Sequence, residues 1–341
     1  MTDNYFSNTL INWYKANKRD LPWRNTKDPY KIWISEIILQ QTKVSQGLPY
    51  YHKFIANFPN VKALAKANEE KVLKTWQGLG YYSRARNMHS AAKYIAFELN
   101  GVFPSTFEEI KKLKGVGDYT AAAISSFCFK EKKPVLDGNV YRLLSRFFGI
   151  ETPIDSSQGK KEFYEILSQL IPDKNPDLFN QSIMEFGALQ CKPKSPNCPS
   201  CTWENKCEAF AKKKTHILPI KSKKKKQRIR YFNYIVYKHE KNLYIQKRIK
   251  KDIWQNMYEF PLLETENEIT KLPEKNFNGG FLKSIKKFKH LLSHQKIYAT
   301  FWEININSSL KNKNQYKVVN LENINEFPFP KIVENYIKND L

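Results

Sequence analysis

The spacing of apolar residues changes its period once along the chain. Up to about residue 211, apolar residues recur three and four positions apart, as they do on one face of an α-helix. Seven segments show this pattern: PYKIWISEIILQQ, EEKVLKTWQGL, SRARNMHSAAKYIAFEL, FEEIKKL, TAAAISSFCF, NVYRLLSRFF and KKEFYEILSQLI. The spacing predicts an all-helical region that ends near residue 211.

Beyond residue 230, apolar and polar residues alternate, which is typical of β-strands. YFNYIVY and LYIQKR flank KHEKN as the two strands of a hairpin would, and KIYATFWEININ alternates again. FPKIVENYIKN returns to helical spacing. We therefore expect a smaller α+β domain at residues 231–341, closed by a helix.

A run of basic residues separates the two patterns. Seven of the ten residues 221–230 are Lys or Arg, and their mutual repulsion favours an extended backbone. We place a linker at residues 212–230, between a helical region at 1–211 and the second domain.

The charge balance points to a polyanionic partner. The chain has 341 residues, and its 57 Lys and Arg against 33 Asp and Glu give a formal charge of +24. An aromatic content of 14% adds side chains that stack on bases. Nucleic acid is the first candidate, although Lys-rich faces often serve only solubility. Since no apolar run reaches membrane-spanning length and no targeting peptide is evident, we expect a cytoplasmic protein without a membrane partner. If the partner is DNA, we expect a monomer associated with the nucleoid.

Four of the five cysteines lie close together: Cys191, Cys198, Cys201 and Cys207. Disulfides suit small secreted domains, whereas this chain is long enough to bury a core and shows no signal segment. A structural zinc usually takes two C-x2-C pairs, but only Cys198 and Cys201 have that spacing. Four thiolates from one compact loop favour a [4Fe–4S] cluster over zinc. Cys128 lies in an apolar run and is expected to be a buried small hydrophobe.

A glycine pair stands between two predicted helices in LKGVGDYTAAAI, residues 113–124. Gly115 and Gly117, with Val116 between them, permit a tight turn and close approach of the backbone. The helix that follows begins with N–H groups that can bind an anion, so the segment is a candidate clamp for a DNA phosphate. A glycine-containing helical hairpin is often only a connection, and the basic charge favours the clamp.

Two acidic residues are candidates for chemistry. Asp137 stands at the mouth of the helix predicted in NVYRLLSRFF, where an ordinary N-cap is the simpler interpretation. The same position favours the ionised carboxylate. Glu36 lies on a predicted helix and is solvated if that face is exposed; if the face is buried, desolvation raises its pKa and makes it a proton donor. One protonated and one ionised carboxyl group is the arrangement that breaks glycosidic bonds.

Together these motifs resemble the iron–sulfur DNA glycosylases of the helix-hairpin-helix superfamily. Within it, LPWR, SEIILQQT and LDGNVYR are similar to the adenine DNA glycosylases of the MutY type. The resemblance is strong over residues 5–210 and weaker in the second domain, where DIWQNMYEFP and HLLSHQKI are similar to a MutT-like (Nudix-like) module. It implies a mainly α protein with a six-helix module at about 27–132, an iron–sulfur module from about 1–26 and 133–211, and a smaller α+β domain.

The resemblance implies a base-excision repair enzyme that hydrolyses an N-glycosidic bond. Glu36 would protonate a flipped adenine, and Asp137 would stabilise the sugar cation or form a transient adduct with it. Tyr119 and Asn139 would support them. Arg24, Leu39 and Gln181 would line the adenine pocket, and Gln41 would fill the gap left in the duplex, which offsets the cost of extruding the base. The cluster would brace a basic loop against DNA.

Position 119 separates two branches of the superfamily. The glycosylase-lyases of the endonuclease III type carry a Schiff-base lysine there, and Tyr119 cannot form an imine. The sequence therefore indicates a monofunctional glycosylase that leaves an abasic site. An endonuclease III-like enzyme for oxidised pyrimidines and a non-catalytic iron–sulfur DNA-binding protein are the alternatives.

In the resembling family the second domain reads 8-oxoguanine opposite the adenine, so double-stranded DNA with A:8-oxoguanine or A:G mispairs is the implied partner. Leu292, Ser293 and His294 stand where that family has Phe-Ser-His. Gln255 and Asn256 replace glycines that usually follow the tryptophan. No acidic box for metal-dependent hydrolysis is present, so we expect this domain to bind and not to hydrolyse.

Overall fold

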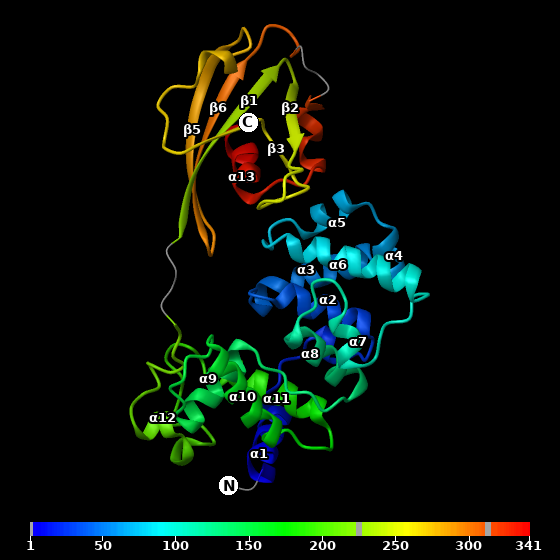
Figure 1. Ribbon diagram of the computed structural model, residues 1–341, viewed down its shortest axis with the longest axis vertical. Coiled ribbons are helices and arrows are strands. Elements are labelled where there is room, and N and C mark those ends of the chain that lie inside the picture. The colour runs from blue at the N-terminus through cyan, green and yellow to red at the C-terminus, as the bar shows by residue number, and fades with distance from the viewer. Residues whose placement is uncertain (1–2, 223–226, 311–314) are drawn as a thin grey trace. The chain divides into compact units, whose positions relative to one another are not determined.

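The computed structural model describes residues 3–222, 227–310 and 315–341. The chain divides into two compact units (Figure 1). The first comprises Met1–Ala65 and Ser90–Lys223, and the second comprises Lys66–His89 and Lys224–Leu341. Because each unit has its own packing, each is described by itself.

Helices make up the part of the chain that precedes the sheet. They are α1 (Asp3–Asn17), α2 (Pro29–Leu39), α3 (Val44–Asn57), α4 (Val61–Lys66), α5 (Glu69–Trp76), α6 (Ser83–Lys93), α7 (Phe107–Lys111), α8 (Asp118–Phe129), α9 (Gly138–Phe148), α10 (Ser157–Leu170), α11 (Pro176–Leu189) and α12 (Glu208–Ala211). All seven segments predicted as helices are helical. None of the described helices combines the length and apolar composition needed to cross a membrane.

Apolar spacing did not single out α1, α3 or α11. Helix α11 is buried around most of its circumference, and its buried residues include Asp177, Asn180, Ser182 and Glu185. Polar side chains at buried positions interrupt the apolar repeat on which the prediction depends. The same residues make α11 important for the site described below.

Aromatic side chains from α1, α9 and α11 form the core of the first unit next to the cysteine loop. Phe6 stacks on Trp203 with ring centroids 4.6 Å apart, and Trp203 also contacts Phe147 and Phe186. Trp203 lies between Cys201 and Cys207 in the sequence, so the cysteine loop is fixed to the helices by its own aromatic residue.

A mixed sheet forms most of the second unit. Its strands are β1 (Arg228–His239), β2 (Asn242–Lys247), β3 (Tyr258–Glu259), β4 (Leu262–Thr265), β5 (Phe281–Leu291), β6 (Gln295–Asn305) and β7 (Lys317–Asn320), followed by helix α13 (Lys331–Asp340). The strand order is β3–β2–β1–β6–β5, with β4 paired to β1 and β7 to β2. The predicted β1–β2 hairpin and the closing helix are both confirmed.

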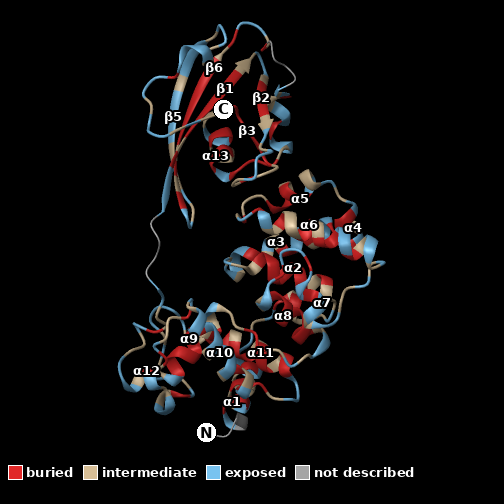
Figure 2. Cartoon of the chain, viewed as in Figure 1, coloured by how far each residue is buried: buried red, intermediate tan, exposed pale blue. Residues whose placement is uncertain are grey.

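The centre of this sheet is buried on both faces. Strands β1 and β6 run parallel from Arg228 opposite Gln295 to Lys238 opposite Asn305, and both are buried over their middle parts (Figure 2). Tyr336 of α13 stacks on Phe301 with centroids 4.2 Å apart, while Trp302 packs into a cluster that includes Leu272. The simple alternation expected from the sequence therefore fails in the strand centres, where both faces have apolar cover.

Residues before the sheet pack more closely than the predicted linker suggests. Leu218 is 2% exposed, and its carbonyl oxygen accepts a hydrogen bond of 3.0 Å from Arg146 Nε. Ile154 N donates to Ile220 O at 3.0 Å. The buried side chain of Leu218 and these two hydrogen bonds hold this stretch to the first unit, and β1 already begins at Arg228. The predicted linker also covers residues 223–226, which lie outside the described residues.

Helix α5 explains why Lys66–His89 belongs to the second unit. Glu70 Oε1 accepts hydrogen bonds of 2.9 Å from Tyr258 Oη and from Lys247 Nζ. Glu69 Oε1 accepts one of 2.6 Å from Asn256 Nδ2. Asn256 has a φ of +67°, in the left-handed region that favours glycine and tolerates asparagine. This backbone conformation accounts for Asn256 where the resembling family has glycine.

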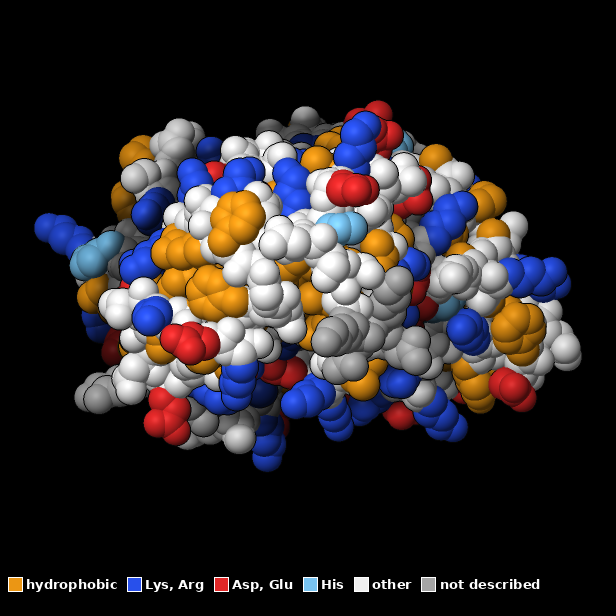
Figure 3. Space-filling model, turned by 90° about the horizontal axis from the view of Figure 1, so that it is seen from above, with side chains coloured by type: hydrophobic (Ala, Val, Ile, Leu, Met, Phe, Trp, Pro, Cys, Tyr) orange, Lys and Arg blue, Asp and Glu red, His pale blue; other side chains and the backbone are white. Residues whose placement is uncertain are grey.

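Lys and Arg side chains are more prominent than acidic ones on the face drawn in Figure 3, in keeping with the formal charge of +24.

Candidate active site

One large, open cavity in the first unit collects all the residues predicted for catalysis and for the adenine pocket. It is lined by Arg24, Glu36, Leu39, Gln41, Gly117, Tyr119, Asp137, Asn139 and Gln181, among others. These residues come from the turn before α2, from α2 and its C-terminal turn, from α8, from the start of α9 and from α11. Residues that are far apart in the sequence thus face one space.

Glu36 is buried in α2, with an exposed fraction of 5%. The helix begins after Asp28, whose carboxylate accepts a hydrogen bond of 2.9 Å from Tyr30 N. Tyr119 Oη donates to Glu36 Oε2 at 2.8 Å. Burial raises the pKa of Glu36 to about 7, since the opposing effects of Tyr119 and Arg24 only partly cancel it and nearby Asp137 adds to it. Glu36 is therefore not a solvated surface acid, and it can carry a proton near neutral pH.

Asp137 caps helix α9 and also faces the cavity. Its Oδ1 accepts hydrogen bonds of 2.8 Å from the N–H groups of Asn139 and Val140, and its Oδ2 accepts one of 2.6 Å from Asn139 Nδ2. Burial raises the pKa of Asp137 above its usual value, and these donors oppose that rise because they stabilise the ionised form. Asp137 can therefore be both the N-cap of α9 and the candidate ionised acid of the cavity.

The predicted helical hairpin is formed by α7 and α8. Gly115 has a φ of +82°, which glycine adopts without strain. Val116 N donates to Leu113 O at 3.0 Å, so its N–H group is already used within the turn. A Cβ added to Gly117 would meet nothing within 4 Å, so the backbone there is open to approach. The N–H groups available to an anion are those of the first turn of α8.

Gln41 lies in the turn after α2 with a φ of +57° and is exposed. A non-glycine residue in the left-handed region stores strain, and such residues concentrate at functional sites.

Two cavity residues are held by partners that the sequence did not reveal. Arg24 donates from Nη1 to Glu185 Oε1 at 2.8 Å and from Nη2 to Glu185 Oε2 at 2.6 Å. Tyr14 Oη donates to Gln181 Oε1 at 2.7 Å. Glu185 lies four residues after Gln181 in α11, hence on the same helical face. A charged residue inside the apolar run SIMEFGAL was the available signal.

Helix α9 connects the cavity to the cysteine loop. Asn139 Oδ1 accepts a hydrogen bond of 2.8 Å from Arg142 Nη2, and Arg142 Nε donates to Cys191 O at 2.8 Å. A Cβ added to Gly187 of α11 would lie 2.7 Å from Asn139 O. The backbones of α9 and α11 approach each other here because Gly187 has no side chain.

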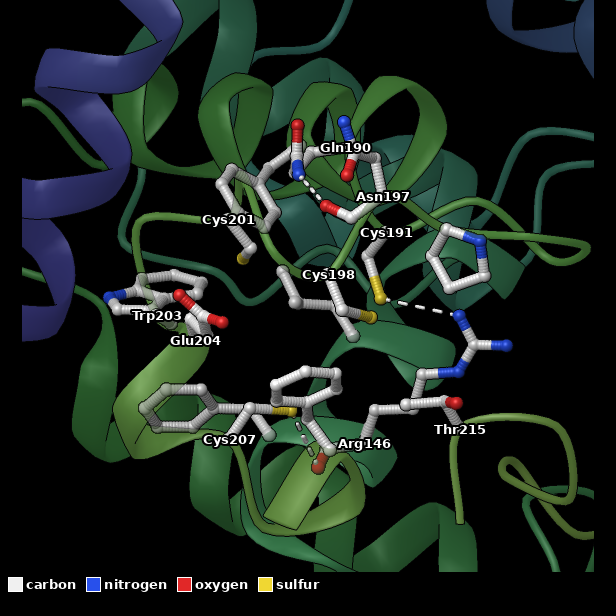
Figure 4. Close-up of a pocket in the computed structure, with 15 residues that line it drawn as sticks. Arg146, Gln190, Cys191, Asn197, Cys198, Cys201, Trp203, Glu204, Cys207 and Thr215 are labelled. Atoms are coloured by element: carbon white, nitrogen blue, oxygen red, sulfur yellow. Dashed lines mark hydrogen bonds between the residues drawn. The ribbon is translucent and has the colours of Figure 1, made fainter. Parts of the chain in front are cut away.

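The four clustered cysteines line a second pocket, with their sulfur atoms around a common space (Figure 4). Its other walls are largely apolar and include Leu143, Phe147, Phe186, Trp203 and Phe210. Arg146 Nη1 donates to Cys191 Sγ at 3.5 Å. Among the described residues, no three His, Cys, Asp or Glu side chains are gathered as a single metal ion requires. The donor set is nevertheless purely sulfur, which fits a thiolate-bound iron–sulfur group.

Cys128 lies apart in α8, where burial raises the pKa of its thiol to about 12. It is half-buried, whereas the sequence predicts a buried residue, and its raised pKa keeps the thiol neutral, as in a small hydrophobe.

The loop Leu292–Ser293–His294 connects β5 to β6 in the second unit. Ser293 and His294 are exposed and Leu292 is half-buried. Leu292 N donates to Gln295 O at 2.8 Å, and Arg228 N donates to His294 O at 3.2 Å. Ser293 Oγ and His294 Nδ1 lie 3.2 Å apart. The loop thus presents two polar side chains from a backbone that β1 and β6 hold.

Comparisons with known proteins identify both parts of the chain. Residues 34–172 match the family described as HhH-GPD superfamily base excision DNA repair protein, and residues 233–339 match the NUDIX domain. A solved structure of a thermostable thymine-DNA glycosylase superposes with a TM-score of 0.57 and 29% identity, covering 62% of this chain and 97% of that one. Fold and cavity therefore define a helix-hairpin-helix base-excision DNA glycosylase with a Nudix-like second domain.

Full-length relatives specify the family further. An adenine DNA glycosylase of Buchnera aphidicola subsp. Acyrthosiphon pisum (strain APS) is 37% identical over 350 residues, which cover 99% of both chains. The human adenine DNA glycosylase is 39% identical over 213 residues, covering 60% of this chain and 39% of that protein. The chain belongs to the adenine DNA glycosylase family and is a glycosidase of base-excision repair. This membership argues against both alternatives, an endonuclease III-like enzyme for oxidised pyrimidines and a non-catalytic DNA-binding protein.

Proposed function

We propose that this glycosylase removes adenine opposite 8-oxoguanine or guanine in double-stranded DNA. The observation that carries the proposal is the pair of acids in one cavity, Glu36 with a pKa of about 7 and Asp137 among three N–H donors. One group is suited to give a proton and the other to face a cation.

In the proposed mechanism, Glu36 protonates the extruded adenine and Asp137 acts on the sugar. Protonation makes the base a better leaving group, and the ionised carboxylate stabilises the oxocarbenium ion or forms a transient adduct with it. The hydroxyl group of Tyr119 orients Glu36, and the amide of Asn139 orients Asp137. Arg24, Leu39 and Gln181 surround the base, while Gln41 occupies the gap in the duplex.

Water completes the reaction, and the product is an abasic site. Tyr119 lies at the start of α8 and has no amine with which to form an imine. Borohydride should therefore trap no protein–DNA adduct, and strand breaks should follow only after alkali. Efficient trapping by the unaltered chain would contradict this step.

Cys191, Cys198, Cys201 and Cys207 are proposed to hold a [4Fe–4S] cluster. When bound, the cluster would cross-link the cysteine loop and would take no part in the chemistry at the adenine. Purified protein should be yellow-brown with about four irons per chain. A colourless protein with stoichiometric zinc would contradict the assignment.

Ser293 and His294 are proposed to read the base opposite the adenine. Their polar atoms are exposed and closely spaced, as hydrogen bonding to a base edge requires. Chromosomal DNA is the proposed partner, and one copy of the chain suffices for the site.

Single-turnover excision on four duplexes tests the whole proposal. The duplexes hold A opposite 8-oxoguanine, A opposite G, A opposite T, and thymine glycol. We expect excision from the first two, with 8-oxoguanine preferred, and none from the last. Release of thymine glycol with strand cleavage would favour the lyase alternative, and binding without excision would favour a non-catalytic protein.

A further inference from the structure

Arg24 has two hydrogen-bonding edges, and the protein uses only one of them fully. Nη1 and Nη2 pair with the two oxygens of Glu185, and Nη1 also donates to Arg19 O at 3.1 Å. The edge formed by Nε–H and the second Nη2 hydrogen donates to no described residue. Because Arg24 lines the cavity, this edge is available to whatever the cavity binds.

Glu185 is built as a buried anion for two guanidinium groups. Its side chain is 1% exposed, and it accepts from Arg19 N, Arg19 Nε and Arg19 Nη2 at 2.9, 2.8 and 2.5 Å in addition to the Arg24 bonds. Burial alone would raise the pKa of Glu185, but the hydrogen bonds from Arg19 and Arg24 outweigh burial and lower it to about 2. Glu185 is thus ionised whenever the protein is folded near neutral pH.

Tyr14 supports the same group from the other side. The Arg24 guanidinium lies over the Tyr14 ring, 5.6 Å from its centroid, and the Tyr14 hydroxyl group fixes the carbonyl end of Gln181. Arg24 is therefore confined between a carboxylate and an aromatic ring, and its orientation toward the cavity is determined by α1 and α11.

We propose that Glu185 is a positioning residue for adenine excision, which directs the free edge of Arg24 into the cavity and neutralises the guanidinium charge beside Glu36. The inference rests on the proposed role of Glu36 as the proton donor. Glu185 need not touch the base, and its effect passes through Arg24.

The charges around Glu36 give this role a distinctive signature. Arg24 lowers the pKa of Glu36, Asp137 raises it, and Tyr119 donates a hydrogen bond to it; Cys128 on α8 is a neutral neighbour. Without the carboxylate of Glu185, the positive charge of Arg24 is no longer paired, so it acts more strongly on Glu36 and favours its ionised form. The pKa of Glu36 should then fall. Excision requires the protonated acid, so the decline in rate at high pH should begin at a lower pH.

The test is single-turnover excision of adenine opposite guanine as a function of pH, with the full chain. Glu185→Gln keeps the shape and removes the charge, and we expect about a ten- to hundredfold lower rate at neutral pH, with the high-pH decline displaced downward. Asp177→Asn is the matched control, because Asp177 is a buried acid of the same helix that pairs with Lys27 at 2.8 Å and does not line the cavity. It should leave the position of the decline unchanged.

A double variant separates positioning from folding. If Glu185 acts through Arg24, Glu185→Gln combined with Arg24→Met should match Arg24→Met alone in rate and pH profile. The inference would be overturned if the rate losses of the two single variants multiplied in the double variant, or if Glu185→Gln left the pH profile of excision unshifted. If circular dichroism shows that Glu185→Gln does not fold, two other variants test the proposal. Arg24→Met should move the high-pH decline in excision rate to a higher pH, and Glu185→Asp should leave it unchanged. A downward shift in Arg24→Met, or any shift in Glu185→Asp, would count against the proposal.

The Glu36→Gln variant distinguishes the two proposals. If the high-pH decline persists in Glu36→Gln, Glu36 is not the titrating acid and the proposed mechanism fails. If the decline disappears there but Glu185→Gln behaves as Asp177→Asn does, only the role of Glu185 is wrong.

Discussion

The cavity of the first unit and the Leu292–His294 loop of the second are built in opposite ways. Glu36 is 5% exposed, and both acids of the cavity have their hydrogen-bond partners within the protein. Ser293 and His294 are exposed, and the protein fixes their backbone but not the surroundings of their side chains. Proton transfer needs a desolvated acid in a fixed position, whereas reading a base needs polar atoms that a nucleic acid can reach. Chemistry and selectivity should therefore respond to different substitutions.

The largest expected effect is on chemistry alone. Glu36→Gln keeps the shape but supplies no proton, so single-turnover excision should fall by about a hundredfold or more while duplex binding persists. Glu98→Gln makes the same change at an exposed position and should have no effect. A near-normal excision rate in Glu36→Gln would mean that the cavity does not supply the proton, and the contrast between a chemical region and a reading region would fail.

The reverse experiment changes selectivity. Ser293→Ala with His294→Ala should reduce the preference for 8-oxoguanine over guanine by about ten- to hundredfold, because one or two hydrogen bonds to a base edge are lost. Excision opposite guanine should change little. Ser308→Ala with His239→Ala removes the same two side chains elsewhere in the same unit, at an exposed and a half-buried position, and serves as the control. Rates are compared at saturating enzyme and fixed salt, so that nonspecific binding cancels. Unchanged discrimination in the double variant would mean that the loop is not the reader.

The pH profile is a milder way to separate the regions. Glu36 must be protonated, and its pKa is about 7, so the excision rate should be full below that pH and fall as pH rises through it, by up to about tenfold per unit. At low pH, protonation of Asp137 should lower the rate again. The ratio of rates opposite 8-oxoguanine and guanine should stay nearly constant from pH 7 to 9. A ratio that followed the rate would link the loop to the chemistry.

The smallest expected effect is on stability. Asn256→Ala leaves a non-glycine residue at a φ of +67° without the side-chain amide that asparagine offers, and it removes the hydrogen bond to Glu69. The free energy of unfolding, measured in denaturant titrations, should fall by about 1 kcal/mol. Asn256→Gly relieves the backbone and should cost less. Excision rates should remain as they are in both variants. Both variants lose the Glu69 bond, so a larger loss in the glycine variant would contradict the view that the left-handed backbone disfavours alanine at this position.

Local spacing predicted seven helical segments and the β1–β2 hairpin, but not α1, α3 or α11. Short motifs named several of the residues that line the cavity. They did not predict that Glu36 is buried, since one helical face looks the same whether water or protein covers it. Tyr14 and Glu185 were missed for a similar reason: each acts through a partner more than a hundred residues away, as the Tyr14–Gln181 and Arg24–Glu185 bonds show. Tertiary partners of this kind leave no local pattern.

Gly187 places a requirement on the gene as well as on the fold. All glycine codons begin with two guanines, and a guanine-to-thymine change in the second position encodes valine. Any side chain at this position would collide with the backbone of Asn139, because even a Cβ lies 2.7 Å from its oxygen. Adenine left opposite 8-oxoguanine leads to that same base change under the proposed specificity. Under that specificity, the codon for Gly187 can be mutated by the same damage that the protein would repair. A cell lineage that lost the activity through this codon would then accumulate guanine-to-thymine changes faster at other positions.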